Sequence, residues 1–520
     1  MLVLFFGLSL GFAQENNACT SDAASAAFVQ GFTAQKEGKN TTAIAEYTKC
    51  LQIEPNCLKC HYEIGWSYWS QSNWTEVKKH WEKVVKMEPQ NQEYADLLNQ
   101  ANEKASPTTS TSQLRIPFGV SSTKNNVTMT MVARFQNYQS NTTNPNDHHD
   151  EMVYSPKSAR FSEDGKKVYV NSLEGTRTVI YNTETLQRIG SIEHRFNKDT
   201  EDLFFGENTV FGYTYNKKSK SGNPNHFMGK PVESALSHNG KYLWVPYYRR
   251  DFDTGATSPS AVSIIDTTTD TIVRVMPTGP IPKYVAISPD NKWAIITHWG
   301  DNTLGVIDIS SGDPKTFKYL EKRLVIERAL SQTGLSGTDR DSTCGFCLRG
   351  TVFTPDSKTL LVARMGGGGV AGFDVDTWTY LGTLYGEKPT PRHLVISNDY
   401  LYMSSNKSGY VSKTSLPNFI NSLRAAEGKK VKYTDWQTTF VGSGARTIDM
   451  SEDGTRLFVA VNNSAKLVVL DPIKMEVLNS IPTDSYTVGL AVSKDGKQVW
   501  TTSQGKKNGG GNSVCVYEIK

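Results

Sequence analysis

Apolar and polar positions follow one recurring pattern over most of the chain, from Ser155 to Lys520. Each repeat has a short apolar run, a turn related to Ser-x-Asp-Gly, and a second apolar run. The turn and the residues before it occur seven times, at 159–165, 234–240, 285–291, 351–357, 394–399, 448–454 and 490–496. A unit of about 40 to 50 residues with four strand-sized pieces is typical of a propeller blade, because one blade cannot bury both of its faces alone. The sequence therefore predicts a mainly β fold, a seven-bladed β-propeller.

The two ends of the repeat region are expected to complete one blade together. After Tyr486 the chain has room for three strands only. Residues 126–135 alternate apolar and polar positions, which is the pattern of a half-buried strand. We expect this early strand to be the fourth strand of the last blade, since closure removes sheet edges that invite aggregation.

A second period, of 34 residues, runs through residues 24–91, where the spacing of apolar residues is helical. A further amphipathic helix at 90–105 is expected to cap the stack. Three pairs of residues mark the period: Gly31 and Gly65, Tyr47 and Trp81, and Pro55 and Pro89. These positions resemble the tetratricopeptide repeat (TPR), in which a small Gly lets two helices approach and a Pro ends the second helix.

The N-terminal residues predict export. Residues 1–13 are almost wholly apolar and end in small residues, as a cleaved signal peptide does; a buried strand or helix is the alternative. No later segment reaches the about 18 apolar residues of a membrane helix. The expected organisation is a signal peptide at 1–13, TPR-like repeats at 14–105, a linker at 106–113 and the propeller at 114–520.

Seven cysteines in an exported protein are expected to be mostly paired. Cys57-Leu58-Lys59-Cys60-His61 matches the string that attaches a c-type haem, but a structural disulfide is favoured there. Cys344 and Cys347 are expected to form a disulfide that anchors an insertion, and Cys515 is expected to be a buried thiol. The disulfide candidates are Cys19, Cys50, Cys57, Cys60, Cys344 and Cys347. No cofactor and no metal site is predicted, and the Asp-His-His-Asp-Glu run at 147–151 is expected to be a solvated loop.

Three strings recur at blade positions: Val-Tyr-Val-Asn at 168–171, Ala-Val-Ser-Ile-Ile-Asp at 261–266 and Ile-Pro-Lys-Tyr-Val-Ala-Ile-Ser-Pro-Asp at 281–290. With these strings the repeats resemble the YVTN-type β-propellers. This resemblance implies the fold and not an activity, because that class includes envelope and surface proteins with no known chemistry. Two insertions depart from it, 206–230 and 310–343, the second with an expected helical stretch at 319–330. Long excursions on a rigid scaffold are where binding specificity tends to lie.

Alignment of the blades on their turns places one residue of each innermost strand at the same height, and five of the seven are cations. A second position, at the end of the next strand, adds a histidine and an arginine. We predict an anion site at the channel mouth, for a carboxylated or phosphorylated glycan or an acidic peptide. The alternative is that each cation pairs with an aspartate of a neighbouring blade. The predicted site residues are Lys157, Lys283, Arg349, Arg392 and Arg446, with His298 and Arg364 from the second position and Glu233 and His393 beside them.

The helical repeats carry a dense group of aromatic residues suited to docking a protein or peptide: Trp66, Tyr68, Trp69 and Trp74. Alternatively, part of this group covers the repeats against the propeller. Hydrophobic residues make up 38% of the chain and charged residues 21%, with a net charge of +4, which argues against a nucleic-acid partner. The expected function is non-enzymatic binding or scaffolding in the periplasm, at the envelope surface or outside the cell. The alternatives are a lactonase-like hydrolase, for which Glu233 is the one acid placed at the mouth, and a c-type haem redox protein.

Overall fold

The computed structural model describes residues 19–71, 73–105, 115–205, 209–210, 213–214, 222–331, 337–505 and 511–520. The chain divides into two compact units, Met1–Gln113 and Leu114–Lys520. The predicted signal peptide at 1–13, the predicted linker at 106–113 and part of the insertion at 206–230 lie outside the described residues. Within the described residues, no helix has the length and apolar character needed to cross a membrane.

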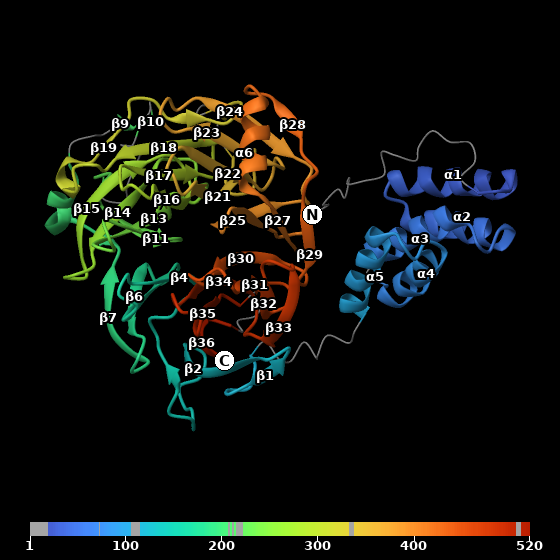
Figure 1. Cartoon of the computed structure of the whole chain (residues 1–520), viewed down its shortest axis with the longest axis horizontal. Coiled ribbons are helices and arrows are strands. Elements are labelled where there is room, and N and C mark those ends of the chain that lie inside the picture. The colour runs from blue at the N-terminus through green and yellow to red at the C-terminus, as the bar shows by residue number, and fades with distance from the viewer. Residues whose placement is uncertain are drawn as a thin grey trace. The chain divides into compact units, whose positions relative to one another are not determined.

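The second unit is a seven-bladed β-propeller, and Figure 1 shows its sheets arranged around a common centre. The first strand of each blade is the innermost, and the chain then runs outward in an antiparallel meander. Blade 1 is β4 (Pro156–Phe161), β5 (Lys167–Ser172), β6 (Arg177–Asn182) and β7 (Gln187–Glu193). Blade 2 is β12 (Ala235–Ser237), β13 (Tyr242–Arg250), β14 (Ser260–Asp266) and β15 (Thr271–Thr278), extended by β11 (Phe227–Pro231) and β8 (Arg195–Phe196). Blade 3 is β16 (Pro282–Ile287), β17 (Trp293–His298) and β18 (Thr303–Asp308), with β19 (Lys318–Tyr319) and β20 (Leu324–Val325) outside.

The remaining blades follow the same order along the chain. Blade 4 is β21 (Leu348–Phe353), β22 (Thr359–Arg364), β23 (Val370–Asp374) and β24 (Tyr380–Tyr385), with a parallel fifth strand, β28 (Lys430–Lys432). Blade 5 is β25 (Pro391–Ser397), β26 (Tyr400–Ser405), β27 (Tyr410–Ser415) and β29 (Gln437–Phe440). Blade 6 is β30 (Ala445–Met450), β31 (Leu457–Val461), β32 (Lys466–Asp471) and β33 (Glu476–Pro482).

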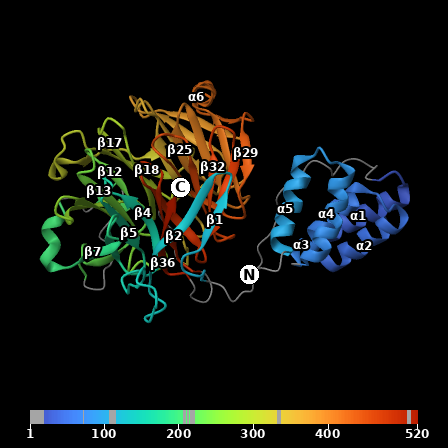
Figure 2. The same ribbon diagram turned by 60° about the horizontal axis from the view of Figure 1, so that its bottom comes forward.

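Blade 7 confirms the expected closure. It consists of β34 (Thr487–Val492), β35 (Gln498–Ser503), β36 (Ser513–Ile519) and, from the other end of the propeller sequence, β2 (Val127–Gln136). β2 pairs antiparallel with β36, from Met129 opposite Ile519 to Gln136 opposite Ser513. The blue-green β2 beside the red C-terminal strands in Figures 1 and 2 is this pairing. β1 (Ser121–Lys124) and β3 (Asp147–His149) extend the same sheet.

The repeated turn owes its shape to side-chain hydrogen bonds. Ser162 Oγ donates to Asp164 Oδ1 at 2.6 Å and accepts from the Lys167 backbone N at 2.9 Å, while Asp164 also accepts from the Lys166 backbone N at 3.1 Å. A short polar side chain that bonds its own backbone stabilises a tight turn. The same hydroxyl–carboxylate pair recurs at Ser288 and Asp290, Thr354 and Asp356, Ser451 and Asp453, and Ser493 and Asp495.

Two local expectations are wrong, and one helix was not foreseen. Residues 319–330 are not helical: Tyr319 and Leu324 lie in two short strands, β19 and β20, that pair with the edge of β18. The edge of blade 3 offers unpaired backbone groups, so pairing there overrides local helical spacing. A helix that the sequence analysis did not predict, α6 (Leu416–Ala425), begins at the Ser415 cap and buries its apolar side against blades 4 and 5. The run at 147–151 is not a solvated loop, because Asp147 and Asp150 are buried and bonded to arginines.

The described part of the first unit is a small helical module of five helices. They are α1 (Asp22–Lys36), α2 (Asn40–Ile53), α3 (Leu58–Ser70), α4 (Trp74–Met87) and α5 (Gln92–Ala105). Gly31 faces the Tyr47 ring and Gly65 faces Trp81, where a Cβ would lie only 2.8 Å and 2.1 Å from the ring atoms. The two glycines therefore permit the close approach of the paired helices, at the interval that the sequence shows.

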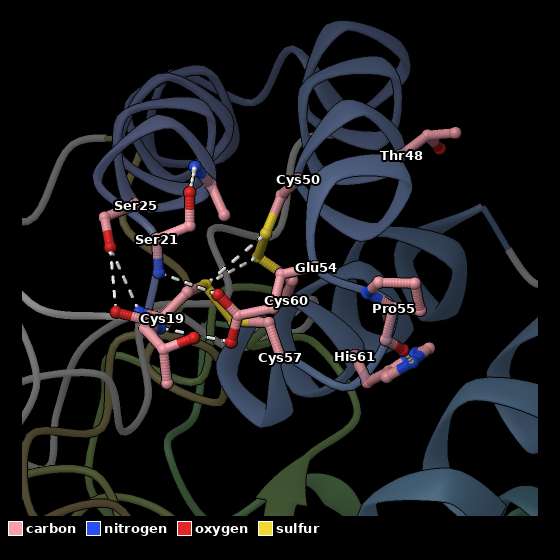
Figure 3. Close-up of a disulfide and its surroundings, with 12 residues drawn as sticks. Cys19, Ser21, Ser25, Thr48, Cys50, Glu54, Pro55, Cys57, Cys60 and His61 are labelled. Carbon is pink, nitrogen blue, oxygen red and sulfur yellow. Dashed lines mark hydrogen bonds between the residues drawn. A yellow bond between two sulfur atoms is a disulfide. The ribbon is translucent and has the colours of Figure 1, made fainter.

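Two disulfides lie side by side in this module, Cys19–Cys57 and Cys50–Cys60 (Figure 3). They join the residues before α1 and the end of α2 to the start of α3. A third disulfide, Cys344–Cys347, lies at the end of the 310–343 insertion, and Cys515 is a buried free thiol. The predicted pairing of cysteines is confirmed.

A buried histidine pair makes the stability of the helical module depend on pH. His61 Nδ1 and His80 Nδ1 are 2.8 Å apart, and His61 Nε2 lies 3.0 Å from the Pro55 carbonyl oxygen. Burial, with smaller effects of His61 and neighbouring charges, lowers the pKa of His80 to about 4. Burial raises the pKa of Glu63 in the same module to about 7, which acts in the opposite sense.

We therefore expect the stability of the wild type to fall more steeply with acid than the stability of the His80→Gln variant. The unfolded chain binds a proton at His80 below about pH 6.5 and the folded chain does not until about pH 4, so acid favours unfolding in this window. Between pH 7 and pH 4 the wild type should lose about 3 kcal/mol of stability relative to His80→Gln. Urea unfolding followed by helical circular dichroism measures it; parallel pH dependences in the two proteins would contradict the assignment.

Candidate site at the channel mouth

The five cations of the predicted ring occupy equivalent places in the fold. Each is the second residue of an innermost strand, and at each the pairing with the second strand shifts by one extra residue. A bulge of this kind re-aims the side chain of the extra residue. The five are Lys157 on β4, Lys283 on β16, Arg349 on β21, Arg392 on β25 and Arg446 on β30.

The five side chains converge closely enough to act on one another electrostatically. Burial lowers the pKa of Lys157, and the positive charges of Arg446, Arg349, Arg392 and Lys283 lower it further. Burial likewise lowers the pKa of Arg392, helped by Arg446 and Arg349. The residues come from blades 1, 3, 4, 5 and 6, so the ring closure brings cations separated by almost 300 residues of sequence to one opening.

Two of the five cations have carboxylate partners. Arg349 Nη2 lies 2.7 Å from Glu233 Oε1, and its Nη1 donates to the Lys283 carbonyl oxygen at 3.0 Å. Lys283 Nζ forms an ion pair with Asp341 and lies over the Trp299 ring, 4.0 Å from its centroid. Burial lowers the pKa of Lys283 to about 7 against the opposing effect of Asp341. The alternative to an anion site was that each cation pairs with an aspartate of a neighbouring blade. These two ion pairs are similar to that arrangement, although one partner is a glutamate and the other comes from an insertion.

The other three cations form no ion pair with a carboxylate of the described residues. Arg392 Nη1 lies 3.2 Å from Met365 Sδ, a weak acceptor, and Arg446 Nε donates to the Val488 carbonyl oxygen at 3.2 Å. Arg392 and Arg446 are only 6% and 7% exposed, and Lys157 is half-buried. Buried charges are stable when they are paired. The mouth therefore has three more basic side chains than carboxylates, and a bound anion would favour the charged forms of these side chains.

His393 lies next to Arg392 and is uncharged at neutral pH. Burial, with the charge of Arg349, lowers its pKa to about 3. Its Nδ1 accepts from the Ile448 backbone N at 3.3 Å, so the neutral ring carries its proton on Nε2, 2.8 Å from the Tyr284 hydroxyl. His393 thus positions the inner strands and adds no charge to the mouth.

The structure does not bring His298 or Arg364 to this cluster. His298 lies on the second strand of blade 3, directly opposite Pro282 of the first strand, and is buried between Thr278 and Thr303. Arg364 lies 2.5 Å from Glu327 and stacks on Phe346, 3.9 Å from its centroid. Second strands lie about 4.8 Å further from the axis and have no bulge here, so their side chains pack inside or between blades.

Asp341 is a site residue that the sequence analysis missed. It belongs to the 310–343 insertion, whose end is clipped by the Cys344–Cys347 disulfide, and its carbonyl oxygen accepts from Trp299 Nε1 at 3.1 Å. The acidic Asp339-Arg340-Asp341 string just before the disulfide was the available signal. Its distance from the blade repeats hid the pairing with Lys283.

The opposite end of the inner strands has a different character. A cavity of about 960 Å³ lies there, and both signs of charge line it. Its charged residues include Arg160, Lys494 and Lys497 and the acids Glu163, Asp449 and Glu452. The excess of positive charge is therefore confined to the Lys157 end of the channel.

The predicted docking aromatics lie within one cluster of the helical module. Trp66 and Trp69 pack on Trp81, with ring centroids 5.0 Å and 5.3 Å apart, and Trp74 meets Trp69 edge-on at 5.0 Å. Tyr68 stacks on His80. All four side chains are half-buried, so they contribute to the core of the module and keep part of their surface exposed.

The haem-attachment string does not serve that purpose in this structure. Cys57 and Cys60 are both in disulfides (Figure 3), which leaves no thiol to bond a haem vinyl group. His61 contacts the Pro55 carbonyl oxygen through Nε2 and His80 through Nδ1. In this arrangement the string forms two disulfides, as the sequence analysis favoured.

Fold and site together define the class of this protein: a seven-bladed β-propeller preceded by a small disulfide-bonded helical module. No protein-family model matches the chain. A stretch of 185 residues is 27% identical to Antigen Lp49 of Leptospira interrogans serogroup Icterohaemorrhagiae serovar copenhageni (strain Fiocruz L1-130) and covers 30% of this chain and 39% of that protein. The chain thus spans well under half the length of that relative.

Two solved structures are similar over most of the propeller. Kuenenia stuttgartiensis hydrazine synthase has a TM-score of 0.47 and 15% identity, over 72% of this chain and 98% of that one. The Cps50 (Swd1) β-propeller domain of Myceliophteria thermophila has a TM-score of 0.48 and 12% identity, over 71% and 97%. One is an enzyme by name and the other is not, and at this similarity neither bears on function.

Proposed function

We propose that this is an exported, non-enzymatic binding protein of the cell envelope or surface, whose propeller binds an anionic ligand at the channel mouth. One observation carries the proposal: five cations converge there and face two carboxylates. The disulfides and the likeness to a protein named as an antigen support an exported, surface-related setting.

We also propose that the helical module docks a protein or peptide of the same envelope. The 34-residue interval and the glycine–aromatic contacts of its helix pairs support a TPR-like scaffold, and the YVTN-like strings support a propeller of the envelope type. The half-buried aromatic cluster provides the kind of surface that anchors a partner.

The lactonase-like alternative is less well supported by the site. A hydrolase needs a free carboxylate base or a metal at the mouth. Glu233 is held in an ion pair with Arg349, and Asp341 in one with Lys283. Both acids thus serve to neutralise cations, which favours binding over hydrolysis.

The test compares two variants that lose the same charge at opposite ends of the channel. Arg392→Gln/Arg446→Gln removes two cations of the mouth without leaving a carboxylate unpaired. Lys494→Gln/Lys497→Gln removes two exposed cations at the other end. Calorimetric titration with a panel of carboxylated and phosphorylated probes at several salt concentrations should give at least ten-fold weaker binding for the first variant and wild-type affinity for the second.

Equal affinities in the wild type and the mouth variant, or equal losses of affinity in both variants, would contradict the proposal. A fall in affinity with rising salt that is steeper in the wild type than in the mouth variant is the accompanying sign of a charge-driven site.

A further inference from the structure

We propose that the ligand of the channel mouth carries a phosphoryl group, as a phosphate monoester or a diphosphate, and that Lys157, Arg392 and Arg446 hold it. This inference rests on the proposed function and names the ligand class of the same site. Its basis is the way paired and unpaired cations divide around the ring.

The paired cations occupy one side of the mouth. Lys283 and Arg349 lie on blades 3 and 4, and Glu233 precedes the innermost strand of blade 2. Asp341 reaches the same side from the insertion. This arc of blades 2 to 4 is close to neutral, because each cation on it has its own carboxylate.

The unpaired cations occupy the other side. Arg392 and Arg446 lie on the neighbouring blades 5 and 6, and Lys157 on blade 1. Blade 7 stands between blades 6 and 1 and has Val488 at the equivalent position, whose carbonyl oxygen fixes Arg446 through Nε. The Arg446 guanidinium lies over the Tyr486 ring, 5.7 Å from its centroid, at the start of the same blade. Arg446 and Lys157 thus lie on the two blades that flank Val488, and Arg392 lies one blade further on.

The compactness of this arc favours one densely charged group over several spread charges. The three cations are at one height of the channel, since each is the second residue of its innermost strand. An acidic peptide carries one charge per carboxylate at steps of about 3.3 Å or more, so it suits a stripe of cations. A phosphate monoester concentrates about 1.5 to 2 negative charges on three oxygens, which suits three cations around a point.

The residue types agree with this charge density. A guanidinium presents donors in a planar fork that matches the oxygens of a phosphate, and lysine binds phosphate as a point charge. Arg392 and Arg446 are both almost fully buried, so their charges lack the hydration that exposed cations have. A doubly charged ion gains more from such partly desolvated cations than a single carboxylate does.

The experiment is calorimetric titration of the full chain with defined small anions. The phosphoryl probes are inorganic phosphate, pyrophosphate and glucose 6-phosphate; the carboxyl probes are glucuronate, citrate and hexaglutamate. We expect pyrophosphate to bind at least ten-fold more tightly than citrate, which has a similar charge, and glucose 6-phosphate at least ten-fold more tightly than glucuronate. Glucose 6-phosphate binding on a par with inorganic phosphate would indicate that the phosphoryl group alone is recognised.

Single variants locate the phosphoryl group. Lys157→Gln, Arg392→Gln and Arg446→Gln should each weaken pyrophosphate binding at least ten-fold, and Arg446→Lys less than Arg446→Gln. Asp341→Asn removes one negative charge from the mouth and should tighten binding. Lys283→Gln/Asp341→Asn, which removes both members of an ion pair on the neutralised arc, should change it less than three-fold. Each variant is first shown by circular dichroism to keep the β-rich spectrum of the wild type.

The outcomes separate the two proposals. Tight citrate or hexaglutamate binding without phosphoryl preference overturns this inference and leaves the anion-binding function standing. Phosphoryl binding that is insensitive to all three unpaired cations overturns this inference as well, because the site is then elsewhere. Absence of binding by every anion in the panel overturns both.

Discussion

Reduction of the two disulfides in the helical module is expected to unfold that module and to leave the propeller folded. The described helices span residues 22–105, a size at which a hydrophobic core alone is marginal. Cys19–Cys57 closes a loop of 38 residues, which limits the unfolded chain enough to stabilise the fold by about 4 kcal/mol, and Cys50–Cys60 adds a loop of 10. Loss of both should exceed the stability that the module has left. Circular dichroism on heating, with and without dithiothreitol, measures the helical signal.

The third disulfide provides the matched control. Cys344–Cys347 has a sequence separation of three and lies in the propeller unit. Cys344→Ser/Cys347→Ser should therefore lower the free energy of unfolding by less than half of the amount expected for Cys19–Cys57, and it should not change the helical signal. Cys50→Ser/Cys60→Ser should lower the melting temperature of the helices and leave the β signal in place. A helical module that melts at the same temperature with all four thiols reduced would show that its core is sufficient by itself.

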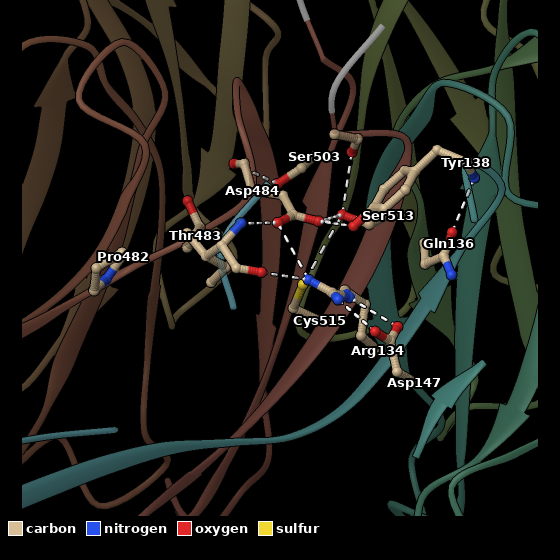
Figure 4. A network of polar contacts seen from close by, with 12 residues as sticks. Arg134, Gln136, Tyr138, Asp147, Pro482, Thr483, Asp484, Ser503, Ser513 and Cys515 are labelled. Carbon is tan, nitrogen blue, oxygen red and sulfur yellow. Dashed lines mark hydrogen bonds and ion pairs between the residues drawn. The ribbon is translucent and has the colours of Figure 1, made fainter. Parts of the chain in front are cut away.

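Replacement of Arg134 by Met is expected to destabilise the propeller by about 3 to 5 kcal/mol, because it leaves two buried carboxylates uncompensated. Arg134 lies on β2 and donates from Nε to Asp147 at 2.9 Å, and its Nη1 lies 3.6 Å from Asp484 (Figure 4). Asp484 is fully buried and also accepts from the Tyr138 hydroxyl at 2.7 Å and from Ser513 Oγ at 2.6 Å. Through Asp484, these contacts join β2, from the start of the propeller sequence, to β36 at its end, where the ring closes.

The exposed ion pair between Lys494 and Glu163 is the control for this prediction. Both side chains are 52% exposed, so Lys494→Met should change the stability by less than 1 kcal/mol. Denaturant unfolding followed by the β signal of circular dichroism gives both values. A change below 1 kcal/mol for Arg134→Met would show that the network is not required for closure, and an intact ring would then depend on the β2–β36 pairing alone.

Periodicity along the chain was sufficient to predict the blades, the closure and the equivalent strand positions of five cations. Position within a repeat translates directly into height along the channel: Lys157 and Arg446 are 289 residues apart but equivalent in their strands. The same logic failed for His298 and Arg364. Their equivalence in sequence is real, but the bulge that turns a side chain toward the axis is present in the first strand and absent in the second.

Sequence spacing could not predict which charged side chains form ion pairs with one another. Nothing in the local sequence distinguishes Lys283, which forms an ion pair with Asp341, from Lys157, which forms none with a carboxylate of the described residues. Likewise, Asp147 belongs to a run that is polar throughout, and only its pairing with Arg134 explains its burial. Whether a charge is paired depends on residues brought close by other blades or by an insertion.

By itself, the amino-acid sequence determined the number of blades, the period of the helices, the pairing of cysteines in general and the set of cations at one height. The tertiary structure alone decided which cations are paired, which insertion reaches the mouth and which cysteine bonds which. The physical reason is the range of the interactions concerned. Burial patterns and turns are set by neighbours in the chain, whereas ion pairs and disulfides are set by distances across the closed ring and between packed helices.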